Sequence, residues 1–132
     1  MKTYYSDGSP KGWLCVKKDN EYTILENKKL LEKIGLSADF VPRTKSQRAE
    51  YLGIIHALQL VDTYDTVMIV SDCENVILQM LGINRCKDRS LQVLNNIAHK
   101  IIKDRGLTIG FEPVEREENP AGVYLENFLK GK

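Results

Sequence analysis

Three acidic residues stand at positions where a carboxylate is costly to bury. Asp72 follows the strand candidate Val67–Val70, whose unbroken apolar residues predict burial on both faces. Asp7 ends the aromatic run TYYSD and falls on the same strand face as Tyr5. Glu50 interrupts an otherwise apolar helical stripe. Each acid alone has an ordinary explanation, as a turn-former or as the complement of a helix dipole.

The three acids together predict a metal site. In an open α/β sheet, ligands bind beyond the carboxyl ends of the parallel strands, where Asp7 and Asp72 are expected. The helix between them in sequence can bring Glu50 to the same place. Clustered carboxylates repel one another unless a positive charge neutralises them. Magnesium prefers oxygen ligands and commonly binds together with substrate phosphates. We therefore expect Mg²⁺ at Asp7, Glu50 and Asp72, with Mn²⁺ as a substitute.

The elements that must position these acids follow from periodicity and turn signals. Gly8-Ser9-Pro10 predicts a turn after the first strand, and Ser46, Ser90 and Asn119 are candidate helix N-caps. The segment 28–36 fits either a strand extension or a helical turn, and a loop with Pro42 follows. The sequence predicts strands over 2–8, 12–19, 21–27, 67–70 and 107–115, and helices over 45–65, 74–81, 88–106 and 118–132.

This order of elements predicts an α/β fold with a mixed sheet. Strands come first and alternate with helices later, which is typical of an antiparallel meander joined to parallel strands by helical crossovers. We expect five strands, three in the meander and two parallel, flanked by helices. The 132 residues suit one domain over 1–132, long enough for a core without disulfide or metal staples.

Composition narrows the class of protein. The chain has 19 basic and 18 acidic residues, so no global charge draws it to a polyanion and any such partner must meet a local patch. Cys15, Cys73 and Cys86 form no C-x-x-C pair and are odd in number, which favours a reduced compartment. The N-terminus does not read as a signal peptide, and every apolar run is too short to span a bilayer. We expect a soluble cytoplasmic monomer with no membrane association.

Three ordered segments resemble a known family. The segments YYSDGS, KSQRAEYLGIIHALQL and VMIVSDCENVI are similar, in this order and at these intervals, to the first three motifs of type 1 ribonuclease H. The meander, the helix order and the late segment VEREENPA extend the resemblance over nearly the whole chain. A glutamate on the first long helix also separates the sequence from transposase and integrase relatives of this fold, whose glutamate comes late.

The resemblance implies a nuclease. Asp7 would bridge two Mg²⁺ ions about 4 Å apart, with Glu50 and Asp72 completing the first, for in-line attack of water on a phosphodiester. The substrate would be the RNA strand of an RNA–DNA hybrid, or another nucleic-acid duplex would be bound. The backbone around Gly8 and Ser9, together with the side chains of Ser46 and Gln47, would contact the 2′-hydroxyls that distinguish RNA from DNA.

The last motif departs from the family. Asn119 is in place, but Val123 stands where the family has the aspartate that holds the second ion, and the preceding loop lacks the histidine of many members. In one reading Glu126, one turn further along the same helix face, reaches the second ion. In the other, the chain has lost efficient cleavage and binds nucleic acid only. The three remaining carboxylates favour retained cleavage, reduced by the missing fourth one.

Overall fold

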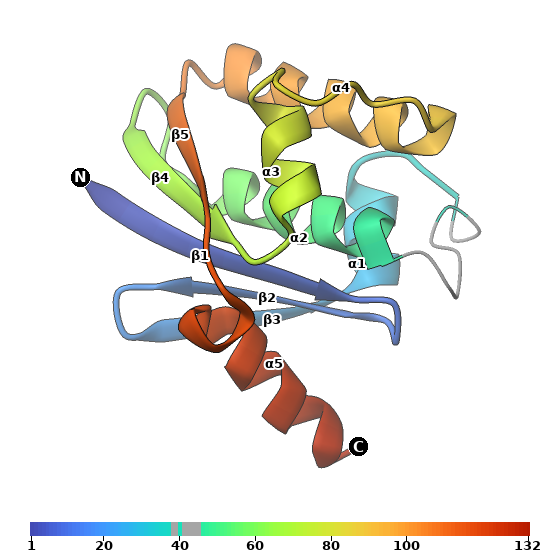
Figure 1. The fold of residues 1–132 in the computed structure, drawn as a ribbon, viewed down its shortest axis with the longest axis vertical. Helices are drawn as coiled ribbons and strands as arrows, with labels where there is room; N and C mark the ends of the chain where they lie inside the picture. Colours follow the sequence, from blue (N-terminus) through green and yellow to red (C-terminus); the bar gives the residue numbers. More distant parts are fainter. Residues whose placement is uncertain (38–39, 41–45) are drawn as a thin grey trace.

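A five-stranded mixed sheet forms the centre of the molecule. The computed structural model describes residues 1–37, 40 and 46–132. The strand order is β3-β2-β1-β4-β5 (Figure 1). The first three strands pair antiparallel and the last two are parallel to β1, so the predicted fold class is confirmed. The strands are β1 (Lys2–Ser9), β2 (Trp13–Lys18), β3 (Glu21–Glu26), β4 (Thr66–Ser71) and β5 (Thr108–Pro113).

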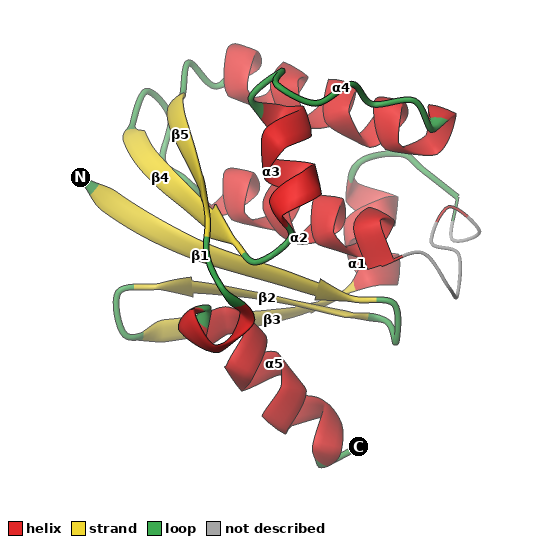
Figure 2. Cartoon of the chain, viewed as in Figure 1, coloured by secondary structure: helices red, strands yellow, loops and turns green. Residues whose placement is uncertain are grey.

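Helices cover the two faces of the sheet unequally (Figure 2). Among the described residues, four helices lie on the side of the sheet that holds the large apolar core, and α5 packs on the other face against β1 and β2. Within the part of the chain that the structure describes, no helix is long and apolar enough to cross a membrane. The helices are α1 (Asn27–Lys33), α2 (Ser46–Leu60), α3 (Glu74–Met80), α4 (Arg89–Asp104), the 3₁₀ turn η2 (Arg116–Glu118) and α5 (Pro120–Lys130).

The predicted turn after the first strand is wrong by about two residues. Gly8 and Ser9 still pair with Leu14 and Trp13 in the β1–β2 ladder, and the turn follows them, with Gly12 at φ +108°. The segment 28–36, left open between strand and helix, is largely helical as α1. The loop with Pro42 lies outside the described residues. The strand expected over 107–115 is β5, which lies at the edge of the sheet and ends at Pro113, a residue that cannot donate to a strand ladder.

The predicted end of the long helix is also wrong. Helix α2 ends at Leu60 rather than Asp65, because the guanidinium of Arg105 donates to the carbonyls of Leu58 and Gln59 at 3.0 and 2.9 Å. These contacts satisfy carbonyls that would otherwise lack a partner at the helix terminus. The chain then turns at Tyr64, which has φ +63°.

The N-cap of α4 is Asp88 and not the predicted Ser90. The Asp88 carboxylate accepts hydrogen bonds from the backbone of Ser90 and Leu91 at 2.8 and 3.3 Å. A carboxylate suits this end of a helix because it faces the positive end of the dipole. Ser90 instead uses its hydroxyl to accept from Arg48 Nε at 2.7 Å. The Asn119 cap of α5, with Pro120 at its first position, is confirmed.

Helix α2 lies against the backbone of β1 at two glycines. A Cβ added at Gly8 would lie 1.9 Å from the Ala49 carbonyl oxygen, and one added at Gly53 would lie 2.8 Å from the Asp7 carbonyl oxygen. Neither position has room for a side chain, so the two backbones come into direct contact. This contact sets the distance between the helix that carries Glu50 and the strand that carries Asp7.

We expect Gly53→Ala to destabilise the protein. The added methyl forces the α2 and β1 backbones apart, which typically costs about 1–3 kcal/mol, against a gain of about 1 kcal/mol in helix propensity. Urea unfolding should show a net loss of about 1–2 kcal/mol. Gly131→Ala is the matched control, because a Cβ there meets only the Phe128 carbonyl at an ordinary 3.6 Å. Equal stability of the two variants would contradict the close-contact account.

The buried His56 makes stability depend on pH. Burial lowers its pKa from 6.5 to about 4, and a backbone hydrogen bond at Thr23 opposes the shift only in part. The unfolded chain therefore takes up a proton between pH 6.5 and 4 that the folded chain refuses, so stability falls as the pH falls through this window.

Between pH 7 and pH 5 this term should remove about 2 kcal/mol of the free energy of unfolding. Urea titrations of the wild type and His56→Gln at both pH values test it, and the variant should lose this part of the pH dependence. The exposed His99 offers the matched control, since His99→Gln should keep the wild-type slope. If His56→Gln keeps that slope too, His56 is not the source of the pH dependence.

Candidate active site

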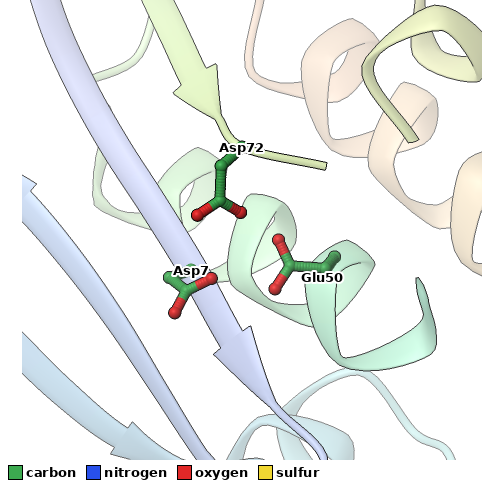
Figure 3. A group of neighbouring side chains, drawn as sticks. All are labelled: Asp7, Glu50 and Asp72. Carbon is green, nitrogen blue, oxygen red and sulfur yellow. The ribbon is translucent and has the colours of Figure 1, made fainter. Parts of the chain in front are cut away.

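The three predicted carboxylates converge near the carboxyl ends of the parallel strands β1 and β4 (Figure 3). One oxygen from each of Asp7, Glu50 and Asp72 lies within 4.8 Å of the others. The register explains the meeting of the two aspartates. Tyr5 is opposite Val70 in the parallel β1–β4 pair, and each aspartate comes two residues later in the chain, Asp7 on β1 and Asp72 directly after β4. Glu50 reaches the same point from α2 because of the close backbone contact described above.

Glu50 is buried and accepts two hydrogen bonds from the protein. Its Oε1 accepts from the backbone N–H of Gly8 at 3.2 Å, and its Oε2 accepts from the Ser71 hydroxyl at 3.3 Å. Burial, followed by the charge of Asp7, raises the pKa of Glu50 well above its usual value. The carboxylates therefore keep a proton at Glu50 more readily than an exposed glutamate would, unless a cation displaces it.

Asp7 is buried to 2% exposure and lies between two sources of charge. Burial raises its pKa, the positive charge of Arg116 acts against that shift, and the negative charge of Asp72 adds to it. Its Oδ1 is 3.1 Å from Arg116 Nη1 without the alignment of a hydrogen bond, and no other described donor reaches this oxygen. A buried carboxylate oxygen with spare acceptor capacity, beside two further carboxylates, suits a hard divalent cation.

Arg116 is a site residue that the sequence analysis missed. It lies on η2, and its Nη1 donates to Asp72 Oδ2 at 2.8 Å while approaching Asp7 Oδ1 at 3.1 Å. Its Nη2 donates to the Gly122 carbonyl at 3.5 Å. The two carboxylates raise the pKa of the guanidinium even though its partial burial acts in the opposite direction. The only signal in the sequence was a single arginine among the glutamates of VEREE.

Helix α5 presents a glycine to the acids. A Cβ at Gly122 would lie 2.5 Å from Arg116 Nη1 and 3.3 Å from Asp72 Oδ2, so the guanidinium occupies the space of a side chain at this position. Val123 is 42% exposed and lines a different hollow, together with Tyr22 and Tyr124. The first turns of α5 thus contribute no carboxylate to the cluster.

The other predicted site residues fall into two groups. Gly8, Ser9, Ser46 and Glu126 line the same hollow as Asp7 and Glu50. Glu126 is more than half exposed there and pairs with Lys130 at 3.8 Å. Gln47 does not line this hollow, and its amide oxygen instead accepts from the Asn75 amide at 3.2 Å.

The chain belongs to the reverse transcriptase-like family, whose model matches residues 23–125. The match includes Glu50 and Asp72 and begins after Asp7. It supports the resemblance to ribonuclease H that the three motifs predicted. No curated protein matches the chain.

Solved structures of ribonuclease H share the fold. RNase H1 from the halophilic archaeon Halobacterium salinarum is 17% identical, with a TM-score of 0.71 over 99% of this chain and 98% of its own. LC11-RNase H1, solved in complex with an RNA/DNA hybrid, is 20% identical, with a TM-score of 0.72 over 95% and 93%. The N-terminal RNase H domain of a Mycobacterium tuberculosis protein is 16% identical, with a TM-score of 0.58 over 94% of both chains. At these identities the likeness establishes the fold.

Asn119 anchors the start of α5 next to the site. It is fully buried, its amide donates to the Ser6 carbonyl at 3.0 Å, and its amide oxygen accepts from the Ala121 backbone at 3.2 Å. We expect Asn119→Ala to cost about 2–3 kcal/mol, because it removes a helix cap and leaves a buried carbonyl unpaired. Urea unfolding measures the loss.

The matched control for Asn119→Ala is Asn127→Ala, since Asn127 lies exposed on the same helix. That change should stay within about 0.5 kcal/mol of the wild type. Amide hydrogen exchange should also show faster opening of α5 in the Asn119 variant alone. Wild-type protection of α5 in Asn119→Ala would count against the anchoring role.

Proposed function

We propose that the protein is a magnesium-dependent endonuclease that hydrolyses the RNA strand of RNA–DNA hybrids. The observation that carries the proposal is the convergence of Asp7, Glu50 and Asp72 within 4.8 Å, on the fold of ribonuclease H. The similarity to LC11-RNase H1, which was solved with an RNA/DNA hybrid, supports the substrate class.

The three carboxylates are the residues that would hold the divalent cation. When bound, such a cation lowers the pKa of water and stabilises the charge that develops on a phosphodiester during hydrolysis. Glu50 must give up its proton for the cation, because its raised pKa favours the protonated form in the free site. Cation affinity should accordingly be weaker at low pH.

The hollow beside the carboxylates supplies a place for the RNA strand. The Gly8–Ser9 backbone and Ser46 line it, and we propose that they contact sugar 2′-hydroxyls next to the scissile phosphate. The amide of Gln47, which accepts from Asn75, would contact an adjacent sugar. Contacts of this kind would make the cleavage specific for RNA. All three cysteines are free, in keeping with a reduced cytoplasmic location, and we propose that the protein acts as a monomer.

A second candidate is a nucleic-acid-binding module that does not cleave. The observation in its favour is the lack of a carboxylate on the first turns of α5, where Gly122 faces the acids and Arg116 fills the space. Such a module would bind hybrids or double-stranded RNA in a salt-sensitive way, because phosphate contacts dominate this binding. Its binding would survive Asp7→Asn. We favour the nuclease because the three carboxylates of the first cation are all retained.

Cleavage of a labelled RNA–DNA hybrid tests the proposal. The wild type should cut the RNA strand with Mg²⁺ or Mn²⁺ and leave duplex DNA intact. Asp72→Asn should lower the rate by about 100-fold or more, comparable to the loss of one preorganised electrostatic contact elsewhere. Asp104→Asn is the control, because Asp104 is exposed and pairs with Lys100 on α4.

Identical purification of the three proteins excludes a contaminating nuclease as the source of the activity. If the wild type fails to cut a hybrid with either cation, the nuclease is refuted. Salt-sensitive hybrid binding in that protein would then identify the binding module.

A further inference from the structure

We propose that Arg116 takes the place of a second metal ion at this site, so that the chain binds one divalent cation and not two. The inference rests on the proposed nuclease function and assigns a cation count to the same site. It starts from the place of the guanidinium, whose Nη1 lies 2.8 Å from Asp72 Oδ2 and 3.1 Å from Asp7 Oδ1.

Arg116 contacts the two aspartates and leaves the Glu50 side of the acid cluster accessible to a cation. The guanidinium approaches the two aspartates from the side of η2 and α5, where it also donates to the Gly122 carbonyl. Glu50 approaches from α2 and accepts only from Gly8 and Ser71 among the described donors. A cation that binds between Glu50 and the aspartates therefore need not displace Arg116, whereas one on the α5 side would have to.

The charges of the site balance with a single dication. Three carboxylates carry three negative charges, and Arg116 with one divalent ion supplies three positive charges. A second divalent ion would leave the cluster with an excess of two positive charges at a place that is largely buried. Uncompensated charge is costly in such surroundings. A further carboxylate together with the departure of Arg116 would balance the charge of the second ion.

Helix α5 lacks such a carboxylate near the guanidinium. Gly122 is the residue of α5 that faces Asp72, and it has no side chain. Val123 is apolar and lines another hollow. Glu126 is the alternative ligand, yet it is exposed and pairs with Lys130 at 3.8 Å. Gly122 and Arg116 are thus complementary, because the guanidinium of Arg116 occupies the space that a side chain at position 122 would need.

Electron paramagnetic resonance of bound Mn²⁺ counts the ions directly, without reference to activity. Two Mn²⁺ ions bridged by one carboxylate give a spin-coupled spectrum, and one ion gives the spectrum of an isolated centre. The wild type should give the isolated spectrum and one tight site per chain, both alone and when frozen rapidly with an RNA–DNA hybrid. Glu126→Gln and the exposed-site control Arg85→Ala should match it.

The double variant Arg116→Ala/Gly122→Asp should give the coupled spectrum, because it removes the guanidinium from beside the two aspartates and adds a fourth carboxylate there. Circular dichroism and a urea titration establish that this variant is folded. Should it fold badly, the wild-type and Glu126→Gln counts decide the question alone.

The possible outcomes separate this inference from the proposed function. A coupled pair of ions in the wild type overturns the inference and leaves the nuclease intact. If that pair becomes a single ion in Glu126→Gln, Glu126 is the second-ion ligand. An isolated spectrum in the folded double variant also contradicts the place assigned to Arg116. No tight Mn²⁺ binding in the wild type overturns the inference together with the proposed metal-dependent function.

Discussion

The close contact between α2 and β1 is the constraint on which the site depends. Gly8 and Gly53 allow the helix backbone to touch the strand backbone, since neither position has space for a Cβ. Only at this separation does the Gly8 N–H donate to Glu50 at 3.2 Å and bring that carboxylate beside Asp7. The two glycines therefore have a structural role that is independent of any contact between Gly8 and a substrate.

The electrostatic cost of the site is shared among several groups. Three acids in a largely buried cluster would repel one another strongly in the absence of compensation. The Arg116 guanidinium offsets the two aspartates, and the Gly8 N–H with the Ser71 hydroxyl stabilises Glu50. Burial, and after it the charge of Asp7, still raises the pKa of Glu50. A further positive charge at this point would stabilise the buried carboxylates, which is the physical basis of the proposed cation site.

Patterns that are local in sequence were sufficient to predict the fold class and the convergence of the three acids. The apolar run before Asp72 and the helical spacing of Glu50 each specify an element and a face, and the parallel register then brings the strand ends together. Features that depend on distant partners were not predictable in this way. Arg105 ends α2 from more than forty residues away, and Arg116 pairs with Asp7 across most of the chain. An isolated arginine in an acidic loop carries no periodicity that would reveal such a pair.

The site has two halves that rest on different parts of the structure. Asp7 and Glu50 lie on β1 and α2, and Asp72 directly follows β4. The packing of these three elements forms much of the large core, so a change in their geometry disturbs the whole fold. The Arg116 half belongs to η2 and α5, and α5 packs on the opposite face through a small cluster around Cys15 and Leu125. Substitutions in this second half therefore change the charge beside the acids at little cost to the main core. This separation gives a physical reason why the last motif can depart from the family, with Val123 at the position of the aspartate, while the other three carboxylates remain in place.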